Sequence, residues 1–122
     1  MSINFHIKTK NTNLTPDLTN YIYDKLGSIE KYITDSSDKE ILAEVEVGLR
    51  SRHHKKGDIF RAEINLTFDG KQYRAVQKAE DMYAALDQLK DEIIKVVKRN
   101  ENKKEDLFRR GARQIKKLLR RN

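Results

Sequence analysis

The pair Asp69-Gly70 stands between two stretches of alternating apolar and polar residues, and this arrangement constrains the fold more than any other feature of the sequence. Asp-Gly is a strong signal for a two-residue hairpin, because that turn needs residues that tolerate positive φ. If Phe68 pairs with Lys71, then Tyr73 and Ala75 lie on the core face, and Arg74 and Val76 point the other way. The preceding strand would place Phe60, Ala62, Ile64, Leu66 and Phe68 inward, and Arg61, Glu63, Asn65 and Thr67 outward.

Two further segments alternate with the same period. Ile3, Phe5 and Ile7 are separated by polar residues, which predicts a half-buried strand at the start of the chain. Residues 41–49 place Ile, Ala, Val, Val and Leu at every second position, which predicts another strand. The sequence therefore predicts four strands.

Two segments repeat their apolar residues at helical spacing. The first helix is expected over about 15–33, with Thr15 as N-cap and Pro16 as its first residue. The second begins near Glu80-Asp81, where acids suit the positive end of the helix dipole. Its apolar stripe consists of Met82, Ala85, Leu86, Leu89, Ile93, Val96 and Val97.

The resulting order is β-α-β-β-β-α, an α+β fold in which two helices cover one face of a four-stranded sheet. A right-handed crossover would make the first two strands parallel. We expect one domain over 1–102 and a basic amphipathic tail over 103–122, joined by a frayed or linker-like stretch at 100–104. Alone, the tail would be a marginal helix, because it is short and self-repelling, and it could become helical on a partner.

The charge of the chain is unevenly distributed. The formal net charge is +7, and the tail alone holds nine Lys and Arg against two acids. The remaining residues 1–102 hold 17 basic and 17 acidic residues, so this part is neutral as a whole. Within it, residues 50–78 carry eight basic residues and three acids, whereas residues 80–92 carry five acids and one Lys. Such segregation favours an oriented contact with a polyanion, with nucleic acid first and acidic membrane second.

The residue types argue against catalysis. The chain has no Cys, and none of its five Gly residues forms a phosphate-binding loop motif. His53-His54 could ligate a metal, but a solvated basic loop is favoured, and Glu44 with Glu46 is expected to be a solvated pair rather than an acid-base pair. We therefore expect neither an enzyme nor a cofactor. The start of the chain lacks the pattern of a secretory signal and no run is long enough to span a membrane, so we expect a cytoplasmic protein.

Three segments, in order, resemble a known family. They are residues 25–32 (KLGSIEKY), 56–64 (KGDIFRAEI) and 80–87 (EDMYAALD). They are similar to the first helix, the central strand and the start of the second helix of the ribosome hibernation promoting factor and ribosome-associated inhibitor family, also described as sigma-54 modulation proteins. The resemblance covers about residues 2–100.

The resemblance implies a fold similar in outline to double-stranded RNA-binding domains, and a function in silencing stored ribosomes. The expected partner is the small ribosomal subunit with its ribosomal RNA, bound in the channel where messenger and transfer RNA meet, by a chain that is monomeric off the ribosome. Because the resemblance does not include the second domain of the family's long form, we do not expect this chain to pair ribosomes by itself. Mapped onto this sequence, the RNA contacts implied are Lys25, Lys31, Lys55, Lys56, Arg61, Lys71, Arg74, Lys78, Lys90, Lys95, Lys98 and Arg99.

The tail departs from the pattern of the plainest family members. It either extends along ribosomal RNA or the messenger path, through Arg109, Arg110, Arg113, Lys116 and Lys117, or is a disordered cationic tail without a fixed site. Tyr21, Tyr23 and Tyr32 are the candidates for base stacking, although at least one is expected at the edge of the core. The alternatives are a generic double-stranded RNA-binding module, and a membrane or protein interaction module that acts through the tail.

Overall fold

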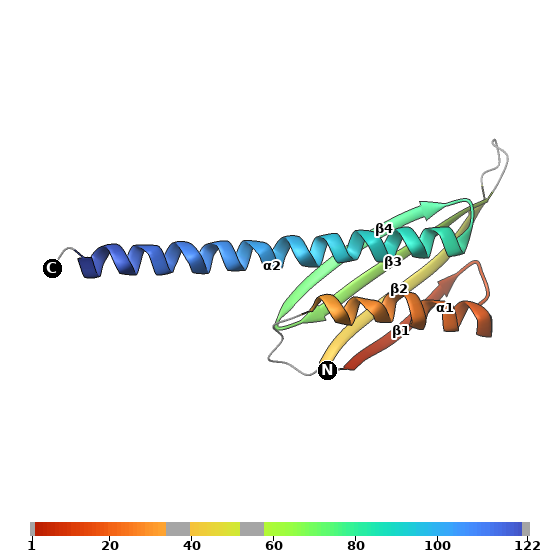
Figure 1. Ribbon diagram of the computed structural model, residues 1–122. Coiled ribbons are helices and arrows are strands. Elements are labelled where there is room, and N and C mark those ends of the chain that lie inside the picture. Colours follow the sequence, from red (N-terminus) through yellow and green to blue (C-terminus); the bar gives the residue numbers. More distant parts are fainter. Residues whose placement is uncertain (1, 34–39, 52–57, 121–122) are drawn as a thin grey trace.

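A computed structural model describes residues 2–33, 40–51 and 58–120, with side chains left out at 2, 51, 58, 101–108 and 112–120. Four strands form one sheet in the order β1-β2-β3-β4. The elements are β1 (Ser2–Lys10), α1 (Pro16–Gly27), the 3₁₀ helix η1 (Ser28–Tyr32), β2 (Glu40–Ser51), β3 (Asp58–Phe68), β4 (Lys71–Ala79) and α2 (Met82–Arg120). The predicted β-α-β-β-β-α order is confirmed (Figure 1).

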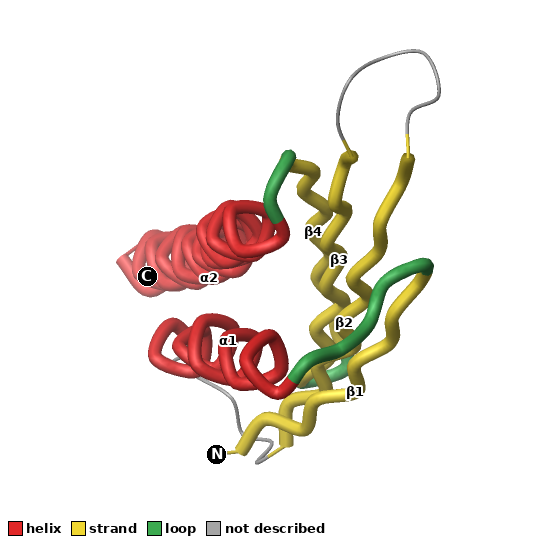
Figure 2. The backbone as a smooth tube through the Cα atoms, turned by 90° about the vertical axis from the view of Figure 1, so that its right-hand side faces the viewer, coloured by secondary structure: helices red, strands yellow, loops and turns green. Residues whose placement is uncertain are grey.

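The sheet is mixed, as the sequence predicted. β1 pairs parallel with β2, whereas the β2–β3 and β3–β4 pairs are antiparallel. Phe68 pairs with Lys71 across the turn, and Asp69 and Gly70 have φ of 52° and 71°, the positive values that the tight hairpin needs. Both helices lie on the same side of the sheet and leave its other face open (Figure 2). This open face is the surface formed by the outward residues of the four strands.

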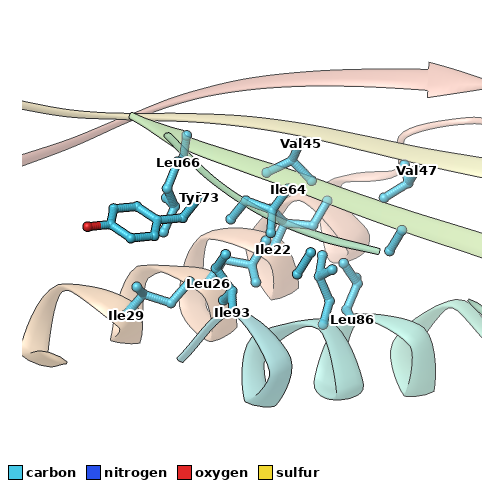
Figure 3. Close-up of a cluster of buried hydrophobic side chains, with 14 of the residues drawn as sticks. Ile22, Leu26, Ile29, Val45, Val47, Ile64, Leu66, Tyr73, Leu86 and Ile93 are labelled. Atoms are coloured by element: carbon cyan, nitrogen blue, oxygen red, sulfur yellow. The ribbon is translucent and has the colours of Figure 1, made fainter. Parts of the chain in front are cut away.

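The core fills the space between the helices and the sheet (Figure 3). The inward residues of β2, β3 and β4 meet Ile22 and Leu26 of α1 and Leu86 and Ile93 of α2, all of which are buried. Among the described residues, no charged side chain is buried. The alternating and helical patterns of the sequence therefore converge on a single apolar layer, which supplies most of the driving force for folding.

The first helix differs from the sequence prediction. It was expected to continue to about residue 33, but the α-helix ends at Gly27 and η1 follows. Gly27 weakens the helix, and the Ser28 hydroxyl donates to the carbonyl of Lys25 at 2.7 Å, which competes with regular helical hydrogen bonds. Its start is as predicted, because the Thr15 hydroxyl accepts the Leu18 N–H at 3.1 Å.

The second helix also differs, because the expected break at 100–104 is absent. α2 runs without interruption from its N-cap Asp81, whose carboxylate accepts the Ala84 N–H, to Arg120. The Asn100 amide donates to the Tyr73 hydroxyl at 2.6 Å and holds α2 against β4, beyond which the helix projects past the sheet (Figure 1). Glu, Lys, Leu and Arg dominate the following sequence and favour a continuous helix. The division into a domain and a functional tail stays a prediction.

We expect opposite effects from alanine at two glycines. Gly70→Ala places a side chain at φ 71° and should lower the free energy of unfolding by about 1–2 kcal/mol. Gly27→Ala lies at helical φ, with nothing within 4 Å of the new Cβ, and should raise it by about 0.4–1 kcal/mol. Urea unfolding of both variants measures the change in the free energy of unfolding. A change in the same direction for both variants would contradict the assignment of the hairpin turn.

Candidate nucleic-acid interface

A basic groove lies where η1 faces α2. We call it the interhelical groove. It has a volume of about 510 Å³, and the described residues of its lining include four lysines and one acid. The residues that line it are Ser28, Lys31, Tyr32, Lys90, Asp91, Ile94, Lys95 and Lys98. Sequence elements far apart in the chain thus bring four of the predicted RNA contacts into one surface.

The helical period of α2 explains how these lysines reach the groove. Lys90, Ile94 and Lys98 follow at four-residue intervals, so they form one line along the helix beside the buried line of Leu89, Ile93 and Val97. Ile94 packs against the core, and the two lysines continue its line into solvent. Burial of the apolar stripe therefore fixes the direction in which the basic side chains point.

Two aromatic rings hold lysine side chains at the helix surface. The ammonium of Lys98 lies 4.6 Å from the ring centre of Tyr32, and that of Lys25 lies 5.5 Å from the ring centre of Tyr21. A cation over an aromatic face is attracted by the ring quadrupole, which orders the long side chain without neutralising its charge. The Tyr32 ring thus orders the Lys98 side chain at the groove and leaves its positive charge in place.

The balance of charge in the groove favours an anionic ligand. Asp91 is the one acid among the described residues that line the groove, and its carboxylate lies 4.0 Å from the ammonium of Lys90, the limit for an ion pair. An exposed pair at that distance is weak. Lys31, Lys95 and Lys98 repel one another, and a phosphate backbone along the groove would relieve this repulsion.

The predicted strand contacts lie on the other side of the molecule. Arg61, Arg74 and Lys78 have the strand parity of the open face, opposite the helices. Glu63 joins two of them: Arg74 Nε donates to Glu63 Oε1 at 2.6 Å, and a guanidinium nitrogen of Arg61 lies 3.6 Å from the same oxygen. Lys71 is exposed beside the hairpin turn. The structure therefore divides the predicted set between two opposite faces.

The remaining predicted contacts are distributed along α2 or fall outside the description. Arg99, Arg109 and Arg110 are exposed on α2. Lys55 and Lys56, like the candidate metal ligands His53 and His54, lie outside the described residues. The side chains of three further members are also outside them: Arg113, Lys116 and Lys117.

The three candidate stacking tyrosines have different surroundings. Tyr21 packs against the core, as expected of at least one of them. Tyr23 is exposed but meets the ring of Phe5 edge to face, with 5.1 Å between the ring centres. Tyr32 lines the interhelical groove and is 36% exposed, so it alone of the three combines an accessible ring with the lysine cluster.

Sequence reasoning missed part of the groove and part of the open face. Tyr32 and Ile94 line the groove, but their position depends on how η1 packs against α2, which no local pattern reveals. Lys10 and Arg50 share the open face with Arg61. The alternation of each strand could have identified those two residues.

Other chemistries find little support in the described part of the chain. No group of three or more potential metal ligands occurs among the described residues. Glu44 and Glu46 lie on the open face beside Lys8, in the surroundings expected of a solvated pair. No helix in the described ranges is long and apolar enough to cross a membrane.

Comparison with known families identifies the chain. A family model described as "Sigma 54 modulation protein / S30EA ribosomal protein" matches residues 5–105. The match covers most of the chain, so the chain belongs to this family. The predicted resemblance and fold class are thereby confirmed.

Individual relatives agree with this assignment. The chain is 26% identical over 107 residues to a ribosome hibernation promotion factor of Bacillus subtilis. This match covers 88% of this chain and 53% of the relative. It is 25% identical to a ribosome hibernation promoting factor of Pseudomonas putida, over 88% of this chain and 95% of the relative. The chain thus spans about half the length of the Bacillus relative.

A solved structure matches the architecture. The crystal structure of the Thermus thermophilus Protein Y N-terminal domain has a TM-score of 0.64 and 27% identity, and covers 79% of this chain and 97% of that one. A ribosomal subunit interface protein from Coxiella burnetii shares the fold with a TM-score of 0.62 at 14% identity, over 80% and 97% of the two chains.

A hydrogen bond between Tyr21 and Asp87 joins α1 to α2. The Tyr21 hydroxyl donates to Asp87 Oδ1 at 2.5 Å, and this bond, with burial and nearby carboxylates, raises the pKa of Tyr21 to about 12. Because the folded pKa lies above the ordinary value of 10.0, the stabilisation is complete below pH 10 and is lost as pH rises through 12. Tyr21→Phe should therefore lower the free energy of unfolding at pH 7 by about 0.5–1.5 kcal/mol.

The measurement is denaturant unfolding at pH 7, together with an absorbance titration of tyrosine ionisation. The difference between the absorbance titration curves of wild type and Tyr21→Phe should show that the Tyr21 hydroxyl ionises near pH 12 instead of pH 10. Tyr23→Phe is the control, because its hydroxyl makes none of the hydrogen bonds that the structure describes. A difference titration centred at pH 10 would show that the bond to Asp87 is not formed in solution.

Proposed function

We propose that this member of the S30EA ribosomal protein family is a ribosome hibernation factor that binds the small ribosomal subunit and keeps ribosomes inactive. The observation that carries the proposal is the interhelical groove, where the described lining residues of η1 and α2 include four lysines and a single acid. The names of the Bacillus and Pseudomonas relatives supply the ribosome as the partner. The function is one of binding and occupancy, exerted in the cytoplasm where ribosomes work.

Lysine ammonium groups suit this partner for a physical reason. They neutralise phosphates without reading base sequence, and the counterions released on binding make the affinity fall steeply with salt. The proposed contacts within the groove are Lys31, Lys90, Lys95 and Lys98, with Lys25 and Arg99 beside it. Such a surface would recognise the shape and charge of folded ribosomal RNA.

The proposed site is the channel in which messenger and transfer RNA meet. A folded domain that occupies this channel excludes both ligands, which accounts for inactivity without any chemical step. The family resemblance motivates this choice of site. Pairing of ribosomes is not part of the proposal.

A generic double-stranded RNA-binding module is the second candidate, and the start of α2 argues against it. Such modules place lysines at the start of their last helix, where phosphates approach the positive end of its dipole. Here Asp81 caps that helix and its carboxylate accepts the Ala84 N–H. Equal affinities for plain RNA duplexes and for small subunits, measured at one salt concentration, would favour this alternative.

The helical extension adds a second proposed contact region. Residues 103–120 add about 27 Å of helix at 1.5 Å per residue. The sequence gives this segment a strong positive charge, and Arg109 and Arg110 are exposed on it. We assign it a role along the ribosomal RNA or the messenger path, in which a continuous helix holds the charges at a fixed distance from the groove.

Reversal of three charges on α2 tests the main proposal. The combined change Lys95→Glu, Lys98→Glu and Arg99→Glu should weaken small-subunit binding at least about a hundredfold, and reduce the salt slope by about three. The three residues are exposed, so the melting temperature should stay close to that of wild type. The measurement is co-sedimentation with small subunits, with inhibition of cell-free translation as a second readout.

Single neutralisations provide the matched control. Lys98→Gln removes one charge from the groove, whereas Lys8→Gln removes one from the open face beside Glu44, Glu46 and Glu63. Only Lys98→Gln should reduce binding measurably. The proposal fails if wild type stays at the top of a low-salt gradient, or if both variants bind equally well.

Removal of residues 103–122 tests the extension separately. The last core residue among those described is Val97, so the shortened chain should fold with an unchanged sheet and groove. Because up to nine basic residues are removed, small-subunit affinity and salt slope should both decrease. Co-sedimentation across a salt series measures this, and an unchanged slope would show that the extension makes no phosphate contact.

A further inference from the structure

A second hollow lies on the open face of the sheet, on the side opposite the interhelical groove. Its volume is about 380 Å³, and it lies where β1 ends and β2 and β3 continue toward their connecting loop. The residues that line it are Lys10, Asn11, Glu46, Gly48, Leu49, Arg50 and Arg61. We call it the open-face hollow.

Strand register explains how the hollow forms. Lys10 pairs with Gly48, Gly48 pairs with Arg61, and Arg61 pairs with Lys78, so these four residues form one row across all four strands. Gly48 contributes no side chain to that row. Its position leaves a depression between two long basic side chains, with strand backbone as its floor.

A side chain at Gly48 would meet the neighbouring strand β1 at ordinary contact distances. A Cβ on Gly48 would lie 3.4 Å from the Lys10 carbonyl oxygen and 3.6 Å from the Lys10 Cβ. These are ordinary van der Waals contacts, so alanine would fit, whereas a longer side chain would fill the hollow. Glycine therefore keeps the space between Lys10 and Arg61 empty.

The charges around the hollow leave a positive surplus. Among the described lining residues, Lys10, Arg50 and Arg61 are basic and Glu46 is acidic. Glu63, the other nearby carboxylate, bonds more closely with Arg74 than with Arg61, whose nitrogen lies 3.6 Å from it. The Arg61 guanidinium can therefore accept a further anion in the forked geometry that suits phosphate.

The lining also indicates which part of a nucleic acid would bind. Among the described residues that line the hollow none is aromatic, so these residues offer no surface on which a base could stack. Long cations over a backbone floor are suited to phosphate oxygens. The basic row continues beyond the hollow to Lys78, farther than one free phosphate would need, which favours a phosphodiester backbone.

We propose that Lys10, Arg50 and Arg61 form a second phosphate-binding site, which holds an RNA backbone on the face opposite the interhelical groove. The chain then contacts two separate RNA segments, one on each side of its two-layer body. This inference rests on the proposed function, because the RNA in question is the ribosomal RNA of the small subunit. Arg74 acts as a positioning residue, which occupies Glu63 and leaves Arg61 available.

The first test fills the hollow. Gly48→Glu places a carboxylate between Lys10 and Arg61 and should weaken co-sedimentation with small subunits about tenfold, a larger loss than that caused by Gly48→Ala, which adds only a methyl group. Because Gly48→Glu could disturb the sheet, the double variant Lys10→Ala with Arg50→Ala is measured beside it. Loss of these exposed charges should reduce the salt slope by about one to two.

The second test locates RNA on each face. The chain has no cysteine, so a single cysteine can carry a tethered iron chelate that cleaves nearby RNA. Val76→Cys reports from the open face, and Asp91→Cys reports from the interhelical groove. With small subunits, the two probes should cleave different segments of ribosomal RNA.

The outcomes separate this inference from the proposed function. If wild type does not bind small subunits, both fail. If wild type binds but the hollow variants bind equally well, or Val76→Cys gives no cleavage while Asp91→Cys does, the second site alone is wrong. Titration with inorganic phosphate distinguishes a site for free phosphate from a site for RNA. If Gly48→Glu loses phosphate binding but keeps full affinity for small subunits, the hollow binds free phosphate and the RNA assignment is wrong.

Discussion

The burial of only one face of the sheet is the constraint on which the rest of this structure depends. Two helices cover that face, and the described core between them and the strands carries no charged side chain. The charged side chains that the structure describes are therefore directed outward, mainly along the outer surfaces of the helices or across the open face. The functional surfaces follow from the core, because the burial of Ile93 and Val97 decides where Lys95 and Lys98 point.

Most of the fold could be predicted from short patterns in the sequence. The alternation of apolar and polar residues predicted the strands, and Asp69-Gly70 predicted the register of the hairpin, because residues close together in the chain decide both. The two differences arose where local preferences compete. Gly27 and the back-bonding hydroxyl of Ser28 change an α-helix into a 3₁₀ turn, and the favourable helix propensities after Asn100 outweigh the polarity that suggested a linker.

The candidate site was less predictable, because it depends on packing between distant segments. The basic residues could be named from sequence and family resemblance, and strand alternation already placed Arg61 and Arg74 on the face away from the helices, but which lysines meet in the groove could not be predicted. Lys31 and Lys98 meet only because η1 packs beside α2, about seventy positions later in the chain. The open-face hollow depends on a residue without a side chain, Gly48, which no search for charged residues would select.

The arrangement of charge explains how a neutral body can bind a polyanion. Residues 80–92 at the start of α2 are acidic, whereas Lys95, Lys98 and Arg99 follow on the same helix and the basic extension lies beyond them. This polarity would direct the acidic end away from RNA and the basic end toward it. On the proposed function, the orientation of the body would then be set before close contact with RNA. A domain of the same net charge with evenly spread charges would bind RNA in many orientations. Segregation of the charges therefore supplies a preferred orientation, which net charge alone does not.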